Sequence, residues 1–222
     1  MQTTESTKQY TPEEYLALEE KAEYKSEYHD GEIIPMTGGS LNHNRIINRI
    51  CAFLLSALRD KNHEPFSSDV RLWIPQYRKF VYPDVMVIQG EPVLYQNRVD
   101  TVTNPKVIIE VLSKSTQDYD MTDKFRYYRS IPELQEYILI NQYLVEVQQY
   151  TKTDEGFWIY RSYESIDNSL RFGTIKADLK LTDIYAGISF SPVYDPALIR
   201  LQQGAVSPQK NYVGEIITNI LI

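Results

Sequence analysis

The chain has 222 residues and a net charge of −7, and 42% of its residues are hydrophobic and 24% charged, a composition typical of a globular protein with one large domain. The acidic balance and the absence of a long basic run argue against tight, non-specific binding of nucleic acid, although the field that governs such binding is a local one. The single cysteine, Cys51, excludes an intrachain disulfide and a Cys/His zinc cluster.

The ends of the chain differ in character from the middle. Residues 1–10 are polar and are expected to fray, residues 11–190 to form the folded domain, and residues 191–222 to form a C-terminal extension. The start of the chain has neither the basic region nor the apolar core of a signal peptide, and no apolar stretch is long enough to span a membrane. We therefore expect a cytoplasmic protein. The 18 tyrosines suit half-buried strands or a subunit interface.

The first predicted elements are two helices on either side of a hairpin. Residues 11–14, Thr-Pro-Glu-Glu, predict the start of a helix that ends near residue 21. Residues 27–36 predict a hairpin with an Asp-Gly turn. Ser40 is a predicted N-cap for the second helix, and His43 heads its inward stripe. The apolar residues of that stripe are Ile47, Ile50, Leu54 and Leu58.

The rest of the domain alternates between strands and short helices. Apolar runs bounded by turn residues predict strands at residues 68–74, 80–88, 107–112, 134–140, 143–150 and 157–163, with a short strand near Leu170. Helices are predicted at residues 118–129 and 181–185. This order predicts a single domain of the α/β or α+β class, with a central mixed β-sheet flanked by helices.

Two carboxylates lie inside these apolar runs. Asp84 lies in the predicted strand 80–88, where it shares a face with Tyr82 and Met86, and Glu110 lies in the strand 107–112. An ionised carboxylate in such a run is costly unless it is paired or bound to a metal. If the two strands are neighbours, the carboxylates converge, and a hard cation such as Mg²⁺ relieves their repulsion. Such a centre, with a water on the metal, is typical of phosphodiester hydrolysis.

An ordered set of motifs surrounds these carboxylates. In chain order they are residues 28–33, residues 36–40 with His43, residues 82–85, residues 109–116, residues 120–124 and Tyr127-Tyr128. Together they resemble the Uma-type family of putative restriction endonucleases that is abundant in cyanobacteria, within the PD-(D/E)XK nuclease superfamily. The resemblance covers residues 11–190. It implies a restriction-endonuclease-like fold, Mg²⁺ or Mn²⁺ as cofactor, DNA as substrate and a homodimer.

The resemblance also implies which residues form the site. Asp84 and Glu110 would bind the metal, together with a backbone carbonyl near Val111. The superfamily usually has its catalytic lysine two residues after the glutamate, where this chain has Leu112. The closer family resembles members in which the lysine has moved to the next helix, and Lys124 fits that position. It lies at the edge of the apolar stripe formed by Met121, Phe125 and Tyr128.

Three further residues are accessory candidates. Lys114 has the right strand parity to replace Lys124 but follows the expected end of the strand. Glu32 is a candidate third metal ligand because it shares a strand face with Ile34 and Met36, which are expected to point inward; it is equally well read as an exposed hairpin residue. His43 is a candidate phosphate contact or partner of Glu32, although a lone histidine is more often a core or cap residue.

Each of the three main candidates, Asp84, Glu110 and Lys124, can also have a purely structural role. Asp84 after a proline can simply make a turn or bulge bond at a strand end. Glu110 can form a structural ion pair with Arg126 or Lys124. Lys124 can pair on the helix surface with Asp120, four residues before it.

The sequence therefore leaves three hypotheses for function. The first is a metal-dependent endonuclease with Asp84, Glu110 and Lys124 at its centre. The second is a non-catalytic binding protein on a nuclease-like fold, which the acidic balance and the absence of lysine at position 112 favour. The third is a hydrolase of a small phosphate substrate, which would have a narrow pocket instead of a groove wide enough for a duplex.

Overall fold

The computed structural model describes residues 8–113 and 119–190. The described residues up to Ile188 belong to one compact unit. The predicted C-terminal extension, residues 191–222, and most of the predicted frayed N-terminus lie outside the described residues. None of the helices in the described part of the chain combines the length and the apolar character needed to cross a membrane.

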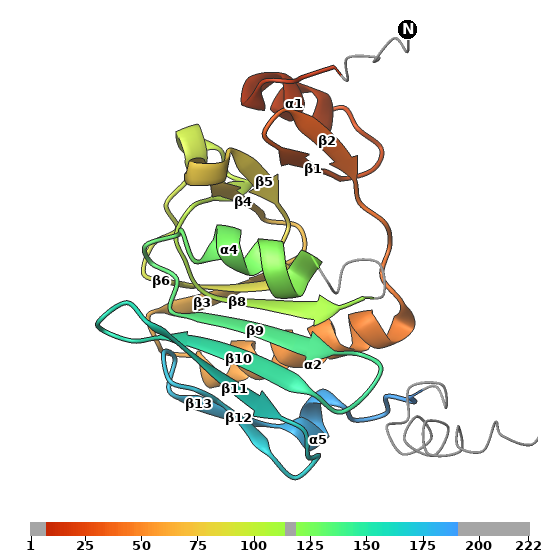
Figure 1. Ribbon diagram of the computed structural model, residues 1–222, viewed down its shortest axis with the longest axis vertical. Coiled ribbons are helices and arrows are strands. Elements are labelled where there is room, and N and C mark those ends of the chain that lie inside the picture. The colour runs from red at the N-terminus through yellow and green to blue at the C-terminus, as the bar shows by residue number, and fades with distance from the viewer. Residues whose placement is uncertain (1–7, 114–118, 191–222) are drawn as a thin grey trace, which may run out of the picture. The chain divides into compact units, whose positions relative to one another are not determined.

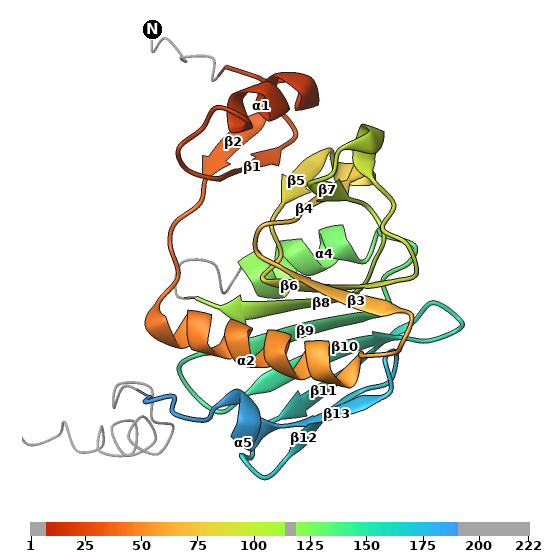
Figure 2. The same ribbon diagram turned by 180° about the vertical axis from the view of Figure 1, so that it is seen from behind.

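A five-stranded sheet carries the N-terminal hairpin (Figures 1 and 2). In sheet order its strands are β2 (Glu32–Pro35), β1 (Ser26–His29), β5 (Lys79–Val81), β4 (Arg71–Ile74) and β7 (Thr101–Val102). Helix α1 (Pro12–Glu19) covers one face, and Tyr15 from this helix stacks on Phe80 with ring centroids 5.4 Å apart. The capping box of Thr11 and Glu14 fixes the start of α1 as the sequence predicts. A short 3₁₀ turn at Pro75–Tyr77 joins β4 to β5, and another at Tyr95–Asn97 precedes β7.

A six-stranded mixed sheet forms the centre of the molecule. In sheet order its strands are β11 (Trp158–Tyr163), β10 (Val147–Lys152), β9 (Glu136–Asn141), β8 (Pro105–Leu112), β6 (Val85–Gln89) and β3 (His63–Ser67). Only β8 and β9 pair in parallel in this sheet. Helix α2 (Leu41–Ala57) lies on one face of it and α4 (Phe125–Tyr128) on the other (Figures 1 and 2). A hairpin of β12 (Ser169–Phe172) and β13 (Ala177–Lys180) leads to α5 (Leu181–Ile184), which contacts α2.

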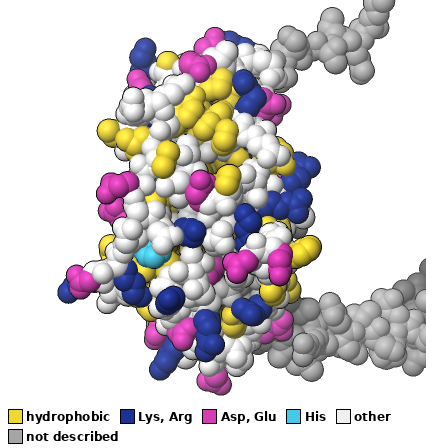
Figure 3. All heavy atoms as spheres, turned by 90° about the vertical axis from the view of Figure 1, so that its left-hand side faces the viewer, with side chains coloured by type: hydrophobic (Ala, Val, Ile, Leu, Met, Phe, Trp, Pro, Cys, Tyr) yellow, Lys and Arg dark blue, Asp and Glu magenta, His cyan; other side chains and the backbone are white. Residues whose placement is uncertain are grey.

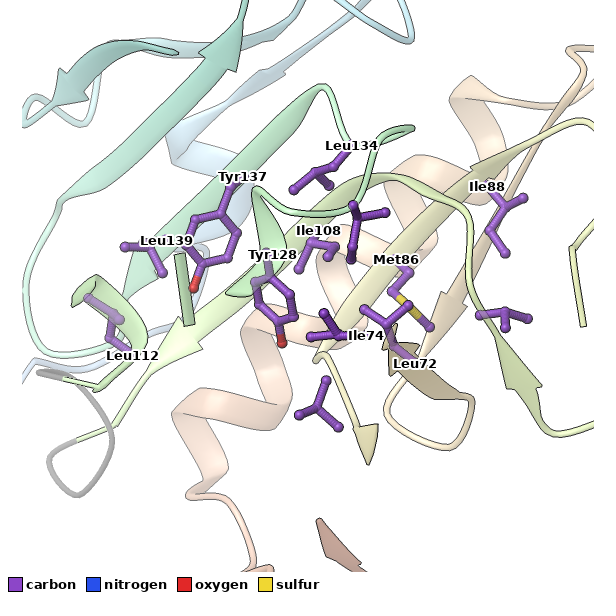
Figure 4. Packing of buried hydrophobic residues seen from close by; sticks show 13 residues of the cluster. Leu72, Ile74, Met86, Ile88, Ile108, Leu112, Tyr128, Leu134, Tyr137 and Leu139 are labelled. Atoms are coloured by element: carbon purple, nitrogen blue, oxygen red, sulfur yellow. The ribbon is translucent and has the colours of Figure 1, made fainter. Parts of the chain in front are cut away.

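The main core fills the space between the central sheet, α4 and strand β4. Side chains from β6, β8, β9, β4 and α4 meet there (Figure 4). Tyr128 and Tyr137 are completely buried in this core, and their rings meet edge to face with centroids 5.3 Å apart. Leu112, where the superfamily lysine would be expected, is part of the same core and is 1% exposed. The side chain at position 112 therefore has a packing role in the core.

The predicted fold class is confirmed, but two predicted strands have different bounds in the structure. The expected strand 80–88 is two strands in two different sheets, β5 and β6, separated at Pro83. Proline has no N–H to donate to a sheet ladder, so the pairing of β5 stops before it. The expected strand 68–74 begins only at Arg71, because Ser68 has a positive φ of 31° in the turn after β3.

Some elements were not predicted at all. Strand β3 lies in a run of mixed polarity that follows α2, and β13 lies in an equally polar run near the end of the domain. The predicted helix 118–129 is a π-helical turn at Asp120–Lys124 followed by the short α4. The wider turn changes which side chains face the sheet, and such turns are frequent at functional sites.

Candidate active site

Asp84 and Glu110 lie side by side because β6 and β8 are neighbours. Val85, the first residue of β6, pairs with Ile109 in antiparallel register, which brings the residue before β6 next to Glu110. The backbone N–H of Asp84 donates to Glu110 Oε2 over 3.3 Å, and the N–H of Val111 donates to Asp84 Oδ2 over 2.7 Å. The predicted convergence of the two carboxylates is present, with Asp84 at the strand end and not inside a continuous strand.

Glu110 is almost completely buried at the bottom of the site. Its side chain is only 4% exposed. Its Oε1 accepts hydrogen bonds from Lys124 Nζ over 3.0 Å and from the hydroxyl of Tyr128 over 2.7 Å. Burial raises the pKa of Glu110 to about 8, because the charge of Lys124 offsets only part of the cost of burial and nearby Asp84 and Asp120 add to it.

The π-helical turn positions Lys124. Its side chain is 11% exposed, and its ammonium group lies 3.0 Å from Glu110 Oε1 and 3.0 Å from Asp120 Oδ1. Burial alone disfavours the charged form, but the negative charges of Glu110 and Asp120 outweigh it and raise the pKa of Lys124 well above the ordinary value. Both ion pairs considered from the sequence, with Glu110 and with Asp120, are therefore present at once, and Lys124 points into the site.

His43 approaches Asp84 from the start of α2. Ser40 caps this helix by accepting a hydrogen bond from the N–H of His43 over 3.1 Å, as the sequence predicts. The Nε2 of His43 lies 3.2 Å from Asp84 Oδ2. Burial lowers the pKa of His43, but the hydrogen bond to Asp84 and the surrounding carboxylates outweigh burial, so the net shift is upward. His43 thus contacts the same oxygen of Asp84 as the N–H of Val111.

A cleft of about 630 Å³ opens over these residues. Its floor consists of Asp84, Glu110 and Lys124, and its opposite wall comes from β1, β2 and the segment that joins β2 to α2. Among the described residues, the charged groups that line it are four carboxylates and one lysine, with no arginine. The cleft is therefore acidic, and a phosphate group entering it would need a cation to offset that charge.

The structure brings together most of the residues that the sequence indicated. Asp84, Glu110, Val111, Lys124 and His43 all line the cleft. Lys114 lies outside the described residues. The role of each of these residues stays a prediction, because their positions alone do not show what they bind.

Glu32 is the exception among the accessory candidates. It is exposed on β2, the edge strand of its sheet, and does not line the cleft. The inward orientation expected for Ile34 and Met36 was wrong, since they are 39% and 37% exposed. They share the cleft side of the hairpin, while the covered face of the hairpin packs under α1.

Three residues at the site were missed by the sequence reasoning. Asp120 is buried beside Lys124, and Glu27 and His29 line the cleft from β1. The signal for Glu27 and His29 was the alternation in the first strand of the hairpin: Tyr28 between them packs against α1, so its two neighbours must face the other way.

The donor set fits Mg²⁺ or Mn²⁺. In residues 8–113 and 119–190, no three His, Cys, Asp or Glu side chains are grouped as a ready metal cage, so a bound cation would have two carboxylates and several waters. Mg²⁺ is usually bound in that way, by one or two carboxylates with most of its waters retained. Burial is the main cause of the raised pKa of Glu110, and the negative charges of Asp84 and Asp120 raise it further.

Comparison with known proteins agrees with this geometry. Residues 12–182 match Uma2, a family described as a putative restriction endonuclease. The chain belongs to this family. Among its relatives are two proteins of Synechocystis sp. (strain PCC 6803), both named as uncharacterized: sll1609, 42% identical over 79% of this chain and 99% of its own length, and slr1290, 37% identical over 81% and 93%.

A solved structure shows the same fold. It is the crystal structure of a putative nuclease belonging to DUF820 from Anabaena variabilis ATCC 29413, with a TM-score of 0.68 and 19% sequence identity. The match covers 81% of this chain and 99% of that one. The predicted family and the nuclease-like fold of the Uma2 chain are both confirmed.

Proposed function

We propose that this protein is a metal-dependent endonuclease that hydrolyses phosphodiester bonds in DNA. The observation that carries the proposal is the convergence of Asp84, Glu110 and Lys124 in one acidic cleft. The family assignment supports nuclease activity in general terms, and the metal, the substrate and the residue roles are our inference.

Asp84, Glu110 and the backbone carbonyl of Val111 would hold Mg²⁺ or Mn²⁺. When bound, the cation supplies an activated water and offsets the charge that develops on the phosphate oxygens. Val111 N–H and His43 fix one oxygen of Asp84, and Tyr128 and Lys124 fix one oxygen of Glu110. Each carboxylate is thereby held in place by hydrogen-bond donors, and the second oxygen of Glu110 also accepts from the backbone N–H of Asp84.

Lys124 acts as a fixed positive charge. Its pKa is raised well above the ordinary value, so the side chain stays protonated near neutral pH and is a poor base. Glu110 and Asp120 hold the ammonium group in place, and its positive charge and remaining donor instead orient the attacking water and stabilise negative charge on the phosphoryl group in the transition state. We therefore assign Lys124 an electrostatic role, and not the role of a base that abstracts a proton.

The binding-protein alternative predicts a lysine that points to solvent and carboxylates capped by arginines. The structure has neither feature at the described cleft: Lys124 is buried between Glu110 and Asp120, and no arginine lines the cleft. The geometry thus favours a reactive centre over an inert ion-pair network.

Hydrolysis of a small phosphate ester is a second candidate, favoured by the size of the cleft. Its volume of about 630 Å³ lies in the range of small-ligand pockets. The charged groups that line the cleft among the described residues are acidic apart from Lys124. Figure 3 shows a different side of the molecule, where Lys and Arg side chains are interspersed with Asp and Glu. The small volume and the acidic lining of the cleft are less favourable to a long duplex than to a flexible strand or a small ester.

Cleavage assays separate these proposals. Purified protein is incubated with supercoiled plasmid, single-stranded DNA and bis(p-nitrophenyl) phosphate, in Mg²⁺, in Mn²⁺ and with EDTA. We expect metal-dependent cleavage of DNA, lowered at least about 100-fold by Asp84→Asn and unchanged by Asp154→Asn, which alters an exposed residue. Turnover of the small ester alone would favour the second candidate, and no turnover of any substrate would contradict both.

A further inference from the structure

A carboxylate–imidazole pair faces the proposed metal site from the opposite wall of the cleft. Glu27 and His29 project from the same face of β1, and their side chains are 12% and 11% exposed. His29 Nε2 lies 2.9 Å from Glu27 Oε2. The other oxygen of Glu27 accepts a hydrogen bond from the backbone N–H of Tyr82 over 3.3 Å. Both residues line the cleft, but neither has a role in the chemistry proposed above.

Glu27 is suited to anchor an imidazole. Burial raises the pKa of Glu27, but the hydrogen bond with His29 and the charge of Lys124 outweigh burial and bring the pKa below its ordinary value. Glu27 is therefore ionised at neutral pH. A carboxylate that holds one ring nitrogen of a histidine fixes the orientation of the ring and leaves the other nitrogen for a ligand.

Tyr119 holds the face of the imidazole. The rings of His29 and Tyr119 stack with centroids 5.9 Å apart and an interplanar angle of 25°. The ammonium group of Lys124 lies 5.9 Å from the centre of the same tyrosine ring. His29, Tyr119 and Lys124 thus form a continuous row from the wall of the cleft to its floor, and all three line the cleft.

The second ring nitrogen of His29, Nδ1, is not engaged in this arrangement. Among the described residues, Nδ1 of His29 has no hydrogen-bond partner, although the ring is fixed on both its edge and its face. His43 differs, because its Nε2 is already used by Asp84. Lys124 differs too, because two carboxylates hold its ammonium group. His29 therefore has a ring nitrogen that is oriented but is not engaged by any described residue.

We propose that His29 is a phosphate-binding residue of the cleft, which donates from Nδ1 to a non-bridging phosphate oxygen of the substrate when its ring carries both protons. The inference rests on the proposed function, since it assigns a substrate contact in the same cleft. The described residues that line the cleft include four carboxylates and one lysine. A charge-assisted hydrogen bond from His29 would help such a lining to hold a phosphate beside the cation. The ligand class is a nucleotide phosphate.

The variant His29→Gln tests this contact. The amide of glutamine can still donate to Glu27, but it presents a carbonyl oxygen to the cleft, which repels a phosphate. His63→Gln is the control, because His63 lies on β3 and does not line the cleft. Glu27→Gln is a second variant, which keeps an acceptor for His29 but removes the negative charge; it decides the question if His29→Gln does not fold.

The first readout is binding of a short fluorescein-labelled single-stranded DNA, followed by fluorescence anisotropy with Ca²⁺ in place of Mg²⁺. We expect His29→Gln to weaken binding about tenfold, Glu27→Gln to weaken it to a smaller degree, and His63→Gln to leave it unchanged. Equal affinities of His29→Gln and His63→Gln would overturn the proposal, as would a wild-type protein that does not bind the DNA.

The second readout is steady-state cleavage of the same DNA in Mg²⁺. A lost phosphate contact raises KM about tenfold with little change in kcat, since the contact is made equally in the ground state and the transition state. A loss of kcat with unchanged KM would overturn the binding role. If the wild-type protein binds DNA but does not cleave it, the endonuclease proposal fails, and the binding readout still decides the role of His29.

Discussion

Lys124 Nζ lies 3.0 Å from Glu110 Oε1, although 14 residues separate the two positions in the chain. The lysine that usually follows the glutamate on the same strand would stand at position 112, and there the side chain is a core leucine. The π-helical turn restores the missing charge from the other side of the carboxylate. In the proposed mechanism, Lys124 takes the place of a lysine on the strand.

The buried carboxylate of Glu110 makes stability depend on pH. Its pKa is about 8 in the folded protein against an ordinary value of 4.5, so between these values the folded state holds a proton that the unfolded state has released. The free energy of unfolding therefore falls as pH rises through this range. Without metal, we expect Glu110→Gln to gain about 1–3 kcal/mol relative to wild type between about pH 5 and pH 9.

Chemical denaturation in a chelating buffer measures this difference. Glu133→Gln is the matched control, because Glu133 is exposed and its replacement should give the same offset at both pH values. A stability difference for Glu110→Gln that does not change with pH would show that Glu110 is already ionised in the folded protein.

His43 should tune metal affinity through Asp84. Its Nε2 contacts the carboxylate at 3.2 Å, and loss of a residue that orients a metal ligand typically lowers affinity about 10–100-fold. We expect His43→Ala to weaken Mn²⁺ binding by this factor in isothermal titration calorimetry, while His63→Ala binds like wild type. Wild-type affinity in His43→Ala would mean that Val111 N–H alone positions Asp84.

The hydroxyl of Tyr128 should stabilise the folded state by holding Glu110. It donates to Oε1 over 2.7 Å in a completely buried place. Its removal leaves the carboxylate with one donor fewer, so Tyr128→Phe is expected to lower the free energy of unfolding by about 1–3 kcal/mol. The control is Tyr160→Phe, since Tyr160 is 52% exposed. Equal unfolding midpoints for both variants would argue against this role.

Glu32 should not contribute to catalysis. It is exposed and lies outside the cleft, so Glu32→Gln is expected to change the cleavage rate less than about twofold and the stability by no more than about 0.5 kcal/mol. A rate loss comparable to that of Asp84→Asn would instead show that the hairpin moves when substrate or metal binds.

Local signals were enough for much of this fold. The capping residues Thr11 and Ser40 start their helices as predicted, and the strand around Glu110 was found because it is apolar on both faces. The sequence alone did not predict that β6 pairs with β8. We expected only that the two carboxylates converge if their strands are neighbours. The pairing depends on tertiary contacts, which no local pattern encodes.

The parts that were missed have physical reasons too. The strand through Pro83 looked continuous because its residues are uniformly apolar, and hydrophobic pattern does not register a change of sheet. Glu32 was chosen as a candidate because it shares a strand face with Ile34 and Met36, whose exposure depends on the position of β2 at the sheet edge. The π-helical turn shifts the helical period that sequence reasoning assumes.

Single-turnover cleavage of single-stranded DNA in Mg²⁺ by Lys124→Ala is the most direct test of the central claim. The wild-type protein and Lys21→Ala, which replaces an exposed lysine, are measured beside it, and folding is checked by thermal unfolding. We predict a folded Lys124→Ala protein that cleaves at least about 100-fold more slowly than both. Cleavage by folded Lys124→Ala at the wild-type rate would contradict the account, because the contact between Lys124 and Glu110 would then be structural only.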